Sequence, residues 1–226
     1  MNKIKTFILQ FENTIEPYEI VPFRGAIINS MEQNNILFHN HTEEGFRYSY
    51  PLIQYKRINQ KAAIVCIGEG TEAIGEYLSN GEISLQIGER VIETKIEHMK
   101  AYQTVVQCWN DMFSYNLYKW MALNQENYKL YQQTESLAER TKFLEKILIG
   151  NLMSFLKGVG IFVDTEIELI ITQIKNERLI RYKGVKFMTF DIDFKTNLSI
   201  PDYIGIGKNA SIGFGMIKRR VVNKTL

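Results

Sequence analysis

The first half of the chain has several short, mainly hydrophobic runs, and at residues 5–11 hydrophobic and polar residues alternate with a period of two. This period predicts β-strands, because successive side chains of a strand point to opposite faces. The predicted strands are residues 5–11, 49–58, 61–68, 83–88 and 90–97, and the last two are expected to pair through Gly88-Glu89. Helices are predicted at 19–33 and 70–81, the second closed by Asn80-Gly81. The resulting order of strand, helix, strand, strand, helix, strand is that of the ferredoxin-like plan, which RNA-recognition motifs also use.

The second half of the chain is predicted to be mixed α and β as well. Its clearest helix covers residues 135–157, where Leu144, Leu148 and Leu152 follow one another at four-residue spacing. The predicted strands are residues 99–109, 166–175, 183–195 and 214–222. No low-complexity linker separates the halves. The sequence therefore predicts an α+β protein with a ferredoxin-like first half and a second half that is also mixed α and β.

Charge is nearly balanced over the whole chain but not along it. The formal net charge is +2 and the charged fraction is 23%, so composition alone does not indicate a nucleic-acid partner. From Met216 onward, however, Lys218, Arg219, Arg220 and Lys224 meet no acidic residue. This end predicts either a positively charged binding surface or a solvated tail that keeps the protein soluble.

The two cysteines and the N-terminal residues indicate the compartment. Cys66 and Cys108 each lie in an apolar run without CxxC spacing, which favours buried thiols over a disulfide or a metal site. No run approaches the 18 apolar residues of a membrane-spanning helix, and no cleavage site follows the N-terminal stretch. A cytoplasmic protein without a membrane partner is expected.

Glycines cluster near the C-terminus, in the run PDYIGIGKNASIGFGMIKRR. Clustered glycines allow positive φ and a close backbone approach to a ligand, and exposed N–H groups of such a loop can hold phosphate. Lys208 could add a point charge to the same phosphate. The spacing is not that of a P-loop or of a dinucleotide fingerprint. The other interpretation is a tight hairpin whose glycines serve geometry alone.

Two of the three histidines, His39 and His41, stand two residues apart. On a strand such residues point the same way, about 7 Å apart. A pair of imidazoles suits acid–base chemistry near pH 7, because one ring can accept a proton while the other donates one. The alternatives are a metal pair, for which no third ligand is evident, or two surface residues of a loop.

The glycine run resembles the C-terminal signature of the RAMP superfamily. In particular it is similar to that of the CRISPR-associated endoribonucleases of the Cas-six family, of the form G-hydrophobic-G-K-x-x-S-x-G-F-G. The matching positions are Gly205, Gly207, Lys208, Ser211, Gly213, Phe214 and Gly215. One branch of this family also places a histidine pair after the first helix, much like His39 and His41. The resemblance covers essentially the whole chain, and it implies an α+β fold of two tandem ferredoxin-like domains side by side, at residues 1–97 and 98–226.

This resemblance implies a metal-independent endoribonuclease that cleaves precursor CRISPR RNA within repeats, without a cofactor. Its catalytic residues would be His39, His41 and Tyr48. Arg47 and Lys56 would neutralise charge that develops on the phosphorus. The remaining RNA-binding residues would be Gly205, Gly207, Lys208, Ser211, Gly213, Gly215, Lys218, Arg219 and Arg220. The partner would be CRISPR repeat RNA, and the sequence leaves open effector-complex subunits and a second copy of the chain.

Two other functions stay open on the sequence. A non-catalytic RAMP subunit that holds guide RNA in an effector complex would share the fold and the glycine segment. A metal-dependent phosphodiesterase would use His39 and His41 as ligands, although no carboxylate cluster accompanies them at convincing spacing.

Overall fold

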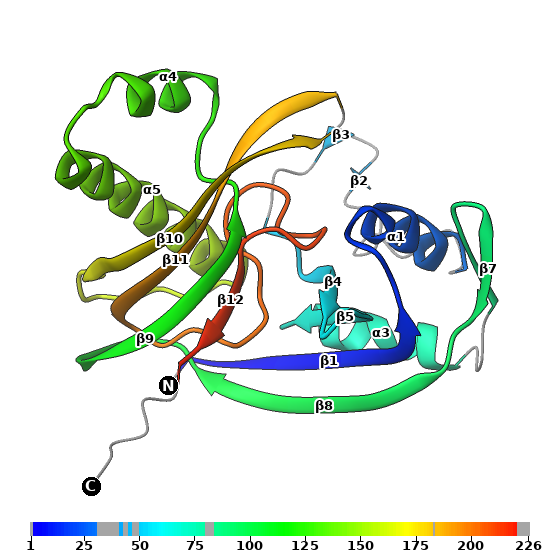
Figure 1. Ribbon diagram of the computed structural model, residues 1–226. Helices are drawn as coiled ribbons and strands as arrows, with labels where there is room; N and C mark the ends of the chain where they lie inside the picture. Colours follow the sequence, from blue (N-terminus) through cyan, green and yellow to red (C-terminus); the bar gives the residue numbers. More distant parts are fainter. Residues whose placement is uncertain are drawn as a thin grey trace, which may run out of the picture. The chain divides into compact units, whose positions relative to one another are not determined.

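The computed structural model describes residues 2–30, 41–42, 45–46, 50–79, 84–182 and 184–220, and it divides into two compact units (Figure 1). The N-terminal unit comprises Lys3–Thr104 together with Ser211–Gly213. The C-terminal unit comprises Val105–Ala210 and the chain from Phe214, with Asn2. Each unit has its own four-stranded sheet and its own buried core.

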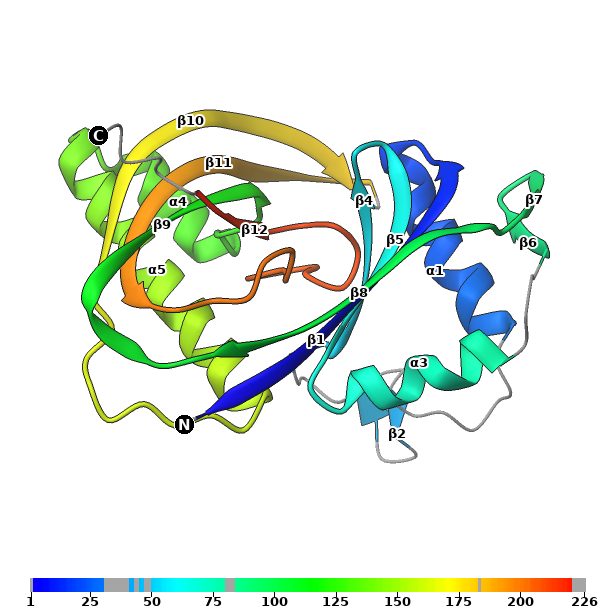
Figure 2. The same cartoon turned by 90° about the horizontal axis from the view of Figure 1, so that it is seen from below.

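The N-terminal sheet has the strand order β4-β5-β1-β8, with the strands lying side by side (Figure 2). The strands are β1 (Lys3–Thr14), β4 (Ile53–Ile58), β5 (Lys61–Ile67) and β8 (Ile96–Val105). Numbered one to four along the chain, they form the order 4-1-3-2 of the ferredoxin-like fold. β1 pairs antiparallel with β5, and β4 pairs antiparallel with β5.

Two helices cover one face of this sheet. They are α1 (Ile20–Asn29), preceded by the 3-10 turn η1 (Pro17–Glu19), and α3 (Gly70–Ser79). Phe11 of β1 makes edge-to-face ring contacts with both Phe23 of α1 and Tyr77 of α3. One strand residue therefore joins both helices to the sheet, and all three rings are buried.

Two small hairpins complete the described N-terminal unit. β6 (Ser84–Ile87) and β7 (Arg90–Glu93) pair through Gly88-Glu89, as the sequence predicts. β2 (His41–Thr42) pairs with β3 (Gly45–Phe46).

The C-terminal sheet has the strand order β10-β11-β9-β12, which is again 4-1-3-2 when read from β12. The strands are β9 (Cys108–Trp120), β10 (Leu169–Tyr182), β11 (Val185–Leu198) and β12 (Met216–Arg219). The helices are α4 (Gln125–Gln133) and α5 (Leu137–Gly158). This confirms the two tandem ferredoxin-like folds that the family resemblance implies.

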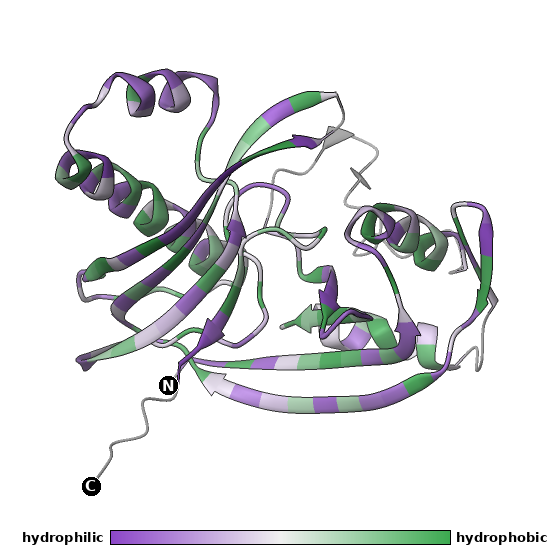
Figure 3. Cartoon of the chain, in the orientation of Figure 1, coloured by the Kyte–Doolittle hydropathy of each residue, from purple (hydrophilic) through white to green (hydrophobic). Residues whose placement is uncertain are grey.

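Helix α5 supplies most of the helical side of the C-terminal core. Ser136 caps it, accepting the Glu139 N–H at 3.4 Å, and Lys157 in the last turn complements the helix dipole. Its buried residues are Leu144, Leu148, Leu152, Phe155 and Leu156. Along α5 hydrophobic and hydrophilic residues interchange, as expected for a helix with one buried face (Figure 3).

Helix α5 corresponds to the first helix of the ferredoxin-like fold, but the second has no counterpart in the C-terminal unit. Residues 199–215, all of them described, connect β11 to β12 without a helix. Ile200, Ile204 and Ile206 of this connection are buried, so the glycine segment provides apolar cover that a second helix would give.

The structure differs from the sequence prediction in several places. β8 ends at Val105 and belongs to the N-terminal unit, so that unit extends beyond the predicted boundary at residues 97 and 98. The predicted strand at 99–109 is the end of β8 and the start of β9, and α4 was not predicted. Cys66 is buried as predicted, whereas Cys108 is half-buried, and both thiols are free.

Within the described residues, none of the helices combines the length and apolarity that crossing a membrane requires.

Candidate functional site

The histidine segment lies largely outside the described residues. His39, Arg47 and Tyr48 are not among them, and of His41 only the backbone is described. That backbone is in β2, where His41 pairs with Phe46. The predicted placement of both imidazoles on the same side of a strand, and the role of Tyr48, therefore stay predictions.

Lys56, the second cation predicted to neutralise phosphate charge, is fully buried in β4. Burial lowers the pKa of its ammonium group to about 7, because a low-dielectric interior disfavours the charged form. In this position Lys56 has no access to an RNA chain at the surface. Lys56 is therefore not among the residues proposed to contact RNA, contrary to the sequence prediction.

The glycine segment folds back on itself as an antiparallel pair. Ile206 N–H donates to Gly215 O at 2.8 Å, Ile217 N–H donates to Ile204 O at 2.9 Å, and Gly205 bridges to Met216. Its tip belongs to the N-terminal unit, where Tyr55 N–H donates to Ser211 O at 2.7 Å and Ile212 forms a parallel bridge with Tyr55. The predicted site residue Ser211 thus completes the free edge of β4 through its backbone.

Three glycines of this segment are required by the geometry itself. Gly207, Gly213 and Gly215 have φ values of +84°, +88° and +62°. A Cβ on Gly215 would stand 1.8 Å from Ile206 O. A Cβ on Gly207 would stand 2.8 Å from the Trp120 indole nitrogen, which donates to Asn151 on α5 at 2.9 Å. The tight-hairpin interpretation therefore accounts for these positions, and any contact with RNA would come in addition.

Lys208 is the exposed cation of the glycine segment. It lines a hollow of about 740 Å³ in the C-terminal unit, together with the first turn of α4 and the start of β11. Partial burial lowers the pKa of Lys208. A cation in such a position gains when an anion approaches it.

The predicted cations Lys218 and Arg219 of β12, and Arg220 directly after it, are exposed, and each has a neighbour. Lys218 lies over the ring of Tyr203 at 5.7 Å, and Arg219 lies over the ring of Phe113 at 4.4 Å. Arg220 pairs with Asp193 at 2.7 Å. In Figure 3 the end of β12 is strongly hydrophilic. Lys218 and Arg219 therefore lie on the edge strand β12, and Arg220 directly follows it.

Asp193, which the sequence did not single out, organises charge beside this strand. Its carboxylate is 5% exposed and pairs with both Arg220 and Lys175, the latter at 2.6 Å. Asn116 of β9 donates to the same carboxylate. The signal in the sequence was slight: Asp193 alternates with the buried Ile192 and Phe194, which places a carboxylate on the opposite face of β11.

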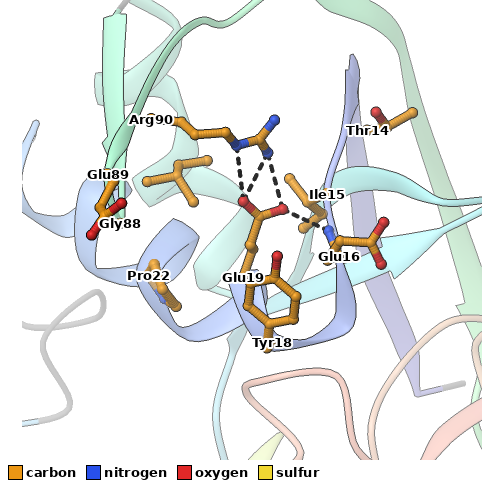
Figure 4. A pocket seen from close by; sticks show the side chains of 10 residues that line it. Thr14, Ile15, Glu16, Tyr18, Glu19, Pro22, Gly88, Glu89 and Arg90 are labelled. Atoms are coloured by element: carbon orange, nitrogen blue, oxygen red, sulfur yellow. Dashed lines mark hydrogen bonds and ion pairs between the residues drawn. The ribbon is translucent and has the colours of Figure 1, made fainter.

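The N-terminal unit has a hollow of different character, of about 510 Å³ beside η1 and the β6–β7 hairpin (Figure 4). Its cation, Arg90, forms a two-point contact with Glu19, whose carboxylate is 9% exposed. The Glu16 N–H donates to the same carboxylate at 2.7 Å. Glu16 and Glu89 also line this hollow, so its charge is acidic, and the guanidinium of Arg90 is already neutralised by Glu19.

Comparisons with known proteins identify relatives along the whole chain. The model of the Cas6b N-terminal domain matches residues 2–105, and the model of the Cas6b C-terminal domain matches residues 107–220. A crystal structure of Cas6b superposes with a TM-score of 0.88 at 26% identity, covering 97% of this chain and 100% of that chain.

Two further relatives extend this result. A crystal structure of the CRISPR RNA processing endoribonuclease Cas6b has a TM-score of 0.76 at 23% identity and covers 97% of this chain and 100% of that one. This likeness shows a shared fold. An uncharacterized protein of Methanocaldococcus jannaschii is 36% identical over 100 residues, which are 44% of this chain and 67% of that protein.

Proposed function

Because this chain belongs to the Cas6b family, whose two domain models match residues 2–105 and 107–220, we propose that it cleaves precursor CRISPR RNA within repeats. The resemblance of the glycine segment to the Cas-six signature agrees with this family membership. The observation that carries the proposal is that both domain models match, one after the other, along nearly the entire chain. The proposed partner is CRISPR repeat RNA, and the proposed product is a guide RNA cut inside each repeat.

The proposed reaction needs no metal ion. The 2′-hydroxyl next to the scissile phosphate loses its proton to a neutral imidazole, and the 2′-oxygen attacks the phosphorus. The bond from phosphorus to the 5′-oxygen breaks, and an imidazolium gives that oxygen a proton. The products are a 2′,3′-cyclic phosphate and a 5′-hydroxyl.

His39 and His41 are the proposed pair of general base and general acid. An imidazole with the ordinary pKa of about 6.5 is protonated in roughly a quarter of the molecules at pH 7, so the neutral and the charged form are both present. Each positioned group contributes about 10²–10⁴ in rate. Tyr48 is proposed to orient the reacting groups, and Arg47 to stabilise the charge that develops on the phosphorane oxygens.

RNA is proposed to bind through the exposed cations of the C-terminal unit. Lys208, the β12 residues Lys218 and Arg219, and the following Arg220 are all exposed, which suits phosphate contacts. Gly205, Gly207, Gly213, Gly215 and Ser211 are proposed to act indirectly, by holding the segment that presents Lys208. Binding through such contacts weakens steeply as salt is raised, because counterions are released from the RNA.

The chemistry is tested with a repeat RNA in which the 2′-hydroxyl beside the cleavage point is replaced by hydrogen. In the presence of EDTA, the unmodified RNA should be cut and the deoxy RNA should stay intact while binding equally well. Cleavage of the deoxy RNA, or loss of all cleavage in EDTA, would contradict the mechanism.

The catalysts are tested with the His39→Ala/His41→Ala double variant. Cleavage should fall by about 10⁴-fold or more, since two groups worth about 10²–10⁴ each are removed, whereas RNA affinity should stay within a few-fold. Full activity of the double variant would remove both histidines from the mechanism. Tight binding without any cleavage by the unaltered protein would instead favour a non-catalytic RNA-binding subunit.

A further inference from the structure

We propose that the hollow between α4, the start of β11 and Lys208 binds one unpaired nucleotide of a single-stranded RNA. Lys186 and Lys208 would contact its phosphate, and Tyr128 and Phe187 would contact its base. The identity of that RNA as a CRISPR repeat rests on the proposed function, but the nucleotide site itself does not.

The dimensions of the hollow suit a ligand of this size. Its volume is about 740 Å³, within the range of roughly 300–1,000 Å³ of small-ligand pockets. Three segments distant in sequence form it, at residues 123–128, 185–188 and 208. All three belong to the C-terminal unit, so the hollow is complete within one folded body.

The charges of the hollow favour an anion. Lys186 and Lys208 are exposed, and in the described part of the chain neither forms an ion pair. Partial desolvation already disfavours the charged form of Lys208, and a phosphate oxygen would offset that cost. Glu126 is the single carboxylate among the lining residues.

The walls of the hollow favour a base rather than a bare phosphate. Tyr128 and Phe187 are half-buried, and both line the hollow. Leu123 and Met188 add apolar surface. An aromatic ring beside a cation is the usual combination for unpaired nucleotides, because every base has a face that can stack.

Two other hollows lack this combination. In the N-terminal hollow, Arg90 is held by Glu19, and two further glutamates repel phosphate (Figure 4). In a hollow of about 450 Å³ along β10, Lys175 is held by Asp193. Cations without a carboxylate partner and aromatic rings therefore meet at the α4 hollow and at neither of these.

The start of α4 adds a smaller contribution. Asn124 caps this nine-residue helix by accepting the Asn127 N–H at 2.7 Å. The first two residues of the helix, Gln125 and Glu126, line the hollow. The positive end of the helix dipole favours phosphate. This feature supports the two lysines and would not define a site without them.

The first test measures salt dependence with the full chain. The probe is a labelled single-stranded repeat RNA kept intact by a 2′-deoxy nucleotide at the cleavage point. Log affinity falls as log salt concentration rises, and Lys186→Met/Lys208→Met should make this fall shallower by a slope of about 0.7 for each lost phosphate contact. Lys129→Met, a change of an exposed α4 lysine that does not line the hollow, is the matched control and should leave the slope unchanged.

The second test separates base contact from charge. Tyr128→Ala should weaken binding about 5-fold to 150-fold, equivalent to 1–3 kcal/mol of base stacking, without altering the salt slope. Tyr128→Phe should restore the affinity, because stacking needs the ring and not the hydroxyl. Thermal unfolding of each variant checks that the fold is retained.

The third test locates the nucleotide directly. RNA that carries 5-iodouridine is irradiated with the unaltered protein, and adducts are mapped by mass spectrometry. Adducts at Tyr128 or Phe187 support the site even if the RNA is never cleaved, so failure of the proposed reaction stays distinguishable. Adducts only elsewhere, together with unchanged affinity and slope in the variants, would overturn it. Equal competition by polyglutamate of matched charge would also overturn it, in favour of an acidic peptide.

Discussion

The two units share one strand order and differ in what connects their third and fourth strands. In the N-terminal unit, α3 leaves β5 and packs Tyr77 against Phe11 of the sheet. In the C-terminal unit, residues 199–215 make the same connection without a helix. Two sheets of the same strand order are thus covered in two ways. A regular helix packs on one, and an irregular segment with buried isoleucines packs on the other.

The difference follows from backbone conformation. Three glycines of the connection take positive φ, which a right-handed helix does not allow. In return the segment presents Lys208 at the surface while Ile204 and Ile206 stay fully buried. A helix would distribute its side chains at fixed angles, whereas the irregular segment places one cation apart from its apolar residues.

The largest expected effect of a single change is in the N-terminal unit. Phe11→Ala removes the ring that joins α1 and α3 to the sheet and leaves a cavity, so the free energy of unfolding should fall by about 3–5 kcal/mol. Phe162→Ala, at a position 88% exposed, is the control and should change stability by at most about 0.5 kcal/mol. Denaturant titration measures both, and similar losses would contradict the helix-joining role.

The next effect tests the glycine cover. Gly215→Ala should cost about 2–5 kcal/mol, because the new Cβ meets the Ile206 carbonyl and the positive φ disfavours any side chain. Gly75→Ala, in α3 with nothing within 4 Å of the added Cβ, should instead be neutral or stabilise by up to about 1 kcal/mol. Equal behaviour of the two variants in thermal unfolding would remove the distinction drawn between helix and segment.

A buried cation in the N-terminal unit should make stability depend on pH. Lys56 loses its proton at a pKa of about 7 in the folded chain, against 10.5 when exposed, so the unfolded chain binds more protons between these values. Stability should therefore rise with pH from about 7, by up to roughly 1.4 kcal/mol per unit. Lys56→Met should flatten this rise, and Lys5→Met, at an exposed position of β1, should not.

The measurement belongs between pH 7 and pH 8.5. Burial raises the pKa of the Cys66 thiol, which makes folding less favourable as pH increases above about 9 and would mask the lysine. An unchanged slope in Lys56→Met within the lower window would show that another group controls it.

The smallest expected effect concerns the charge cluster of the C-terminal unit. Asp193→Asn removes the carboxylate that holds Lys175 and Arg220, both of them partly exposed, and should cost about 1 kcal/mol of stability. RNA binding at low salt should strengthen by a few-fold, because two cations are released for phosphate. Asp164→Asn, a change of an exposed aspartate, is the control. Weaker RNA binding by Asp193→Asn would indicate that the carboxylate positions Arg220 for the RNA.

Periodicity predicted the elements that bury one clear face. Helix α5, with leucines at four-residue spacing, the alternating strand β1 and the continuous apolar strand β5 lie where the sequence places them. Helix α4 was not predicted, because only Tyr131 of its nine residues is buried and its sequence is strongly polar. The end of the first domain lay later than expected, because β8 is an exposed edge strand that joins β1 over more than eighty residues.

The candidate sites divide in the same way. A contiguous glycine signature could be found in the sequence, and so could the paired histidines, whose arrangement stays a prediction. The α4 hollow could not, because Tyr128, Lys186 and Lys208 meet only after β9, β11 and the glycine segment have packed. The role of Asp193 likewise depends on Lys175 and Arg220 from two other segments. A motif of contiguous residues can be found in the sequence, whereas these clusters form from residues that are distant in sequence and are brought together by folding.

The N-terminal unit is not contiguous in the chain, since Ser211–Gly213 completes the free edge of β4. During synthesis, the first 104 residues therefore leave the ribosome about a hundred residues before their last strand partner does. Throughout that interval the nascent domain carries an open edge at Tyr55, a place where another chain can add. Production of the N-terminal half alone should therefore yield a protein that associates, and the last part of the chain acts as the closure of the first.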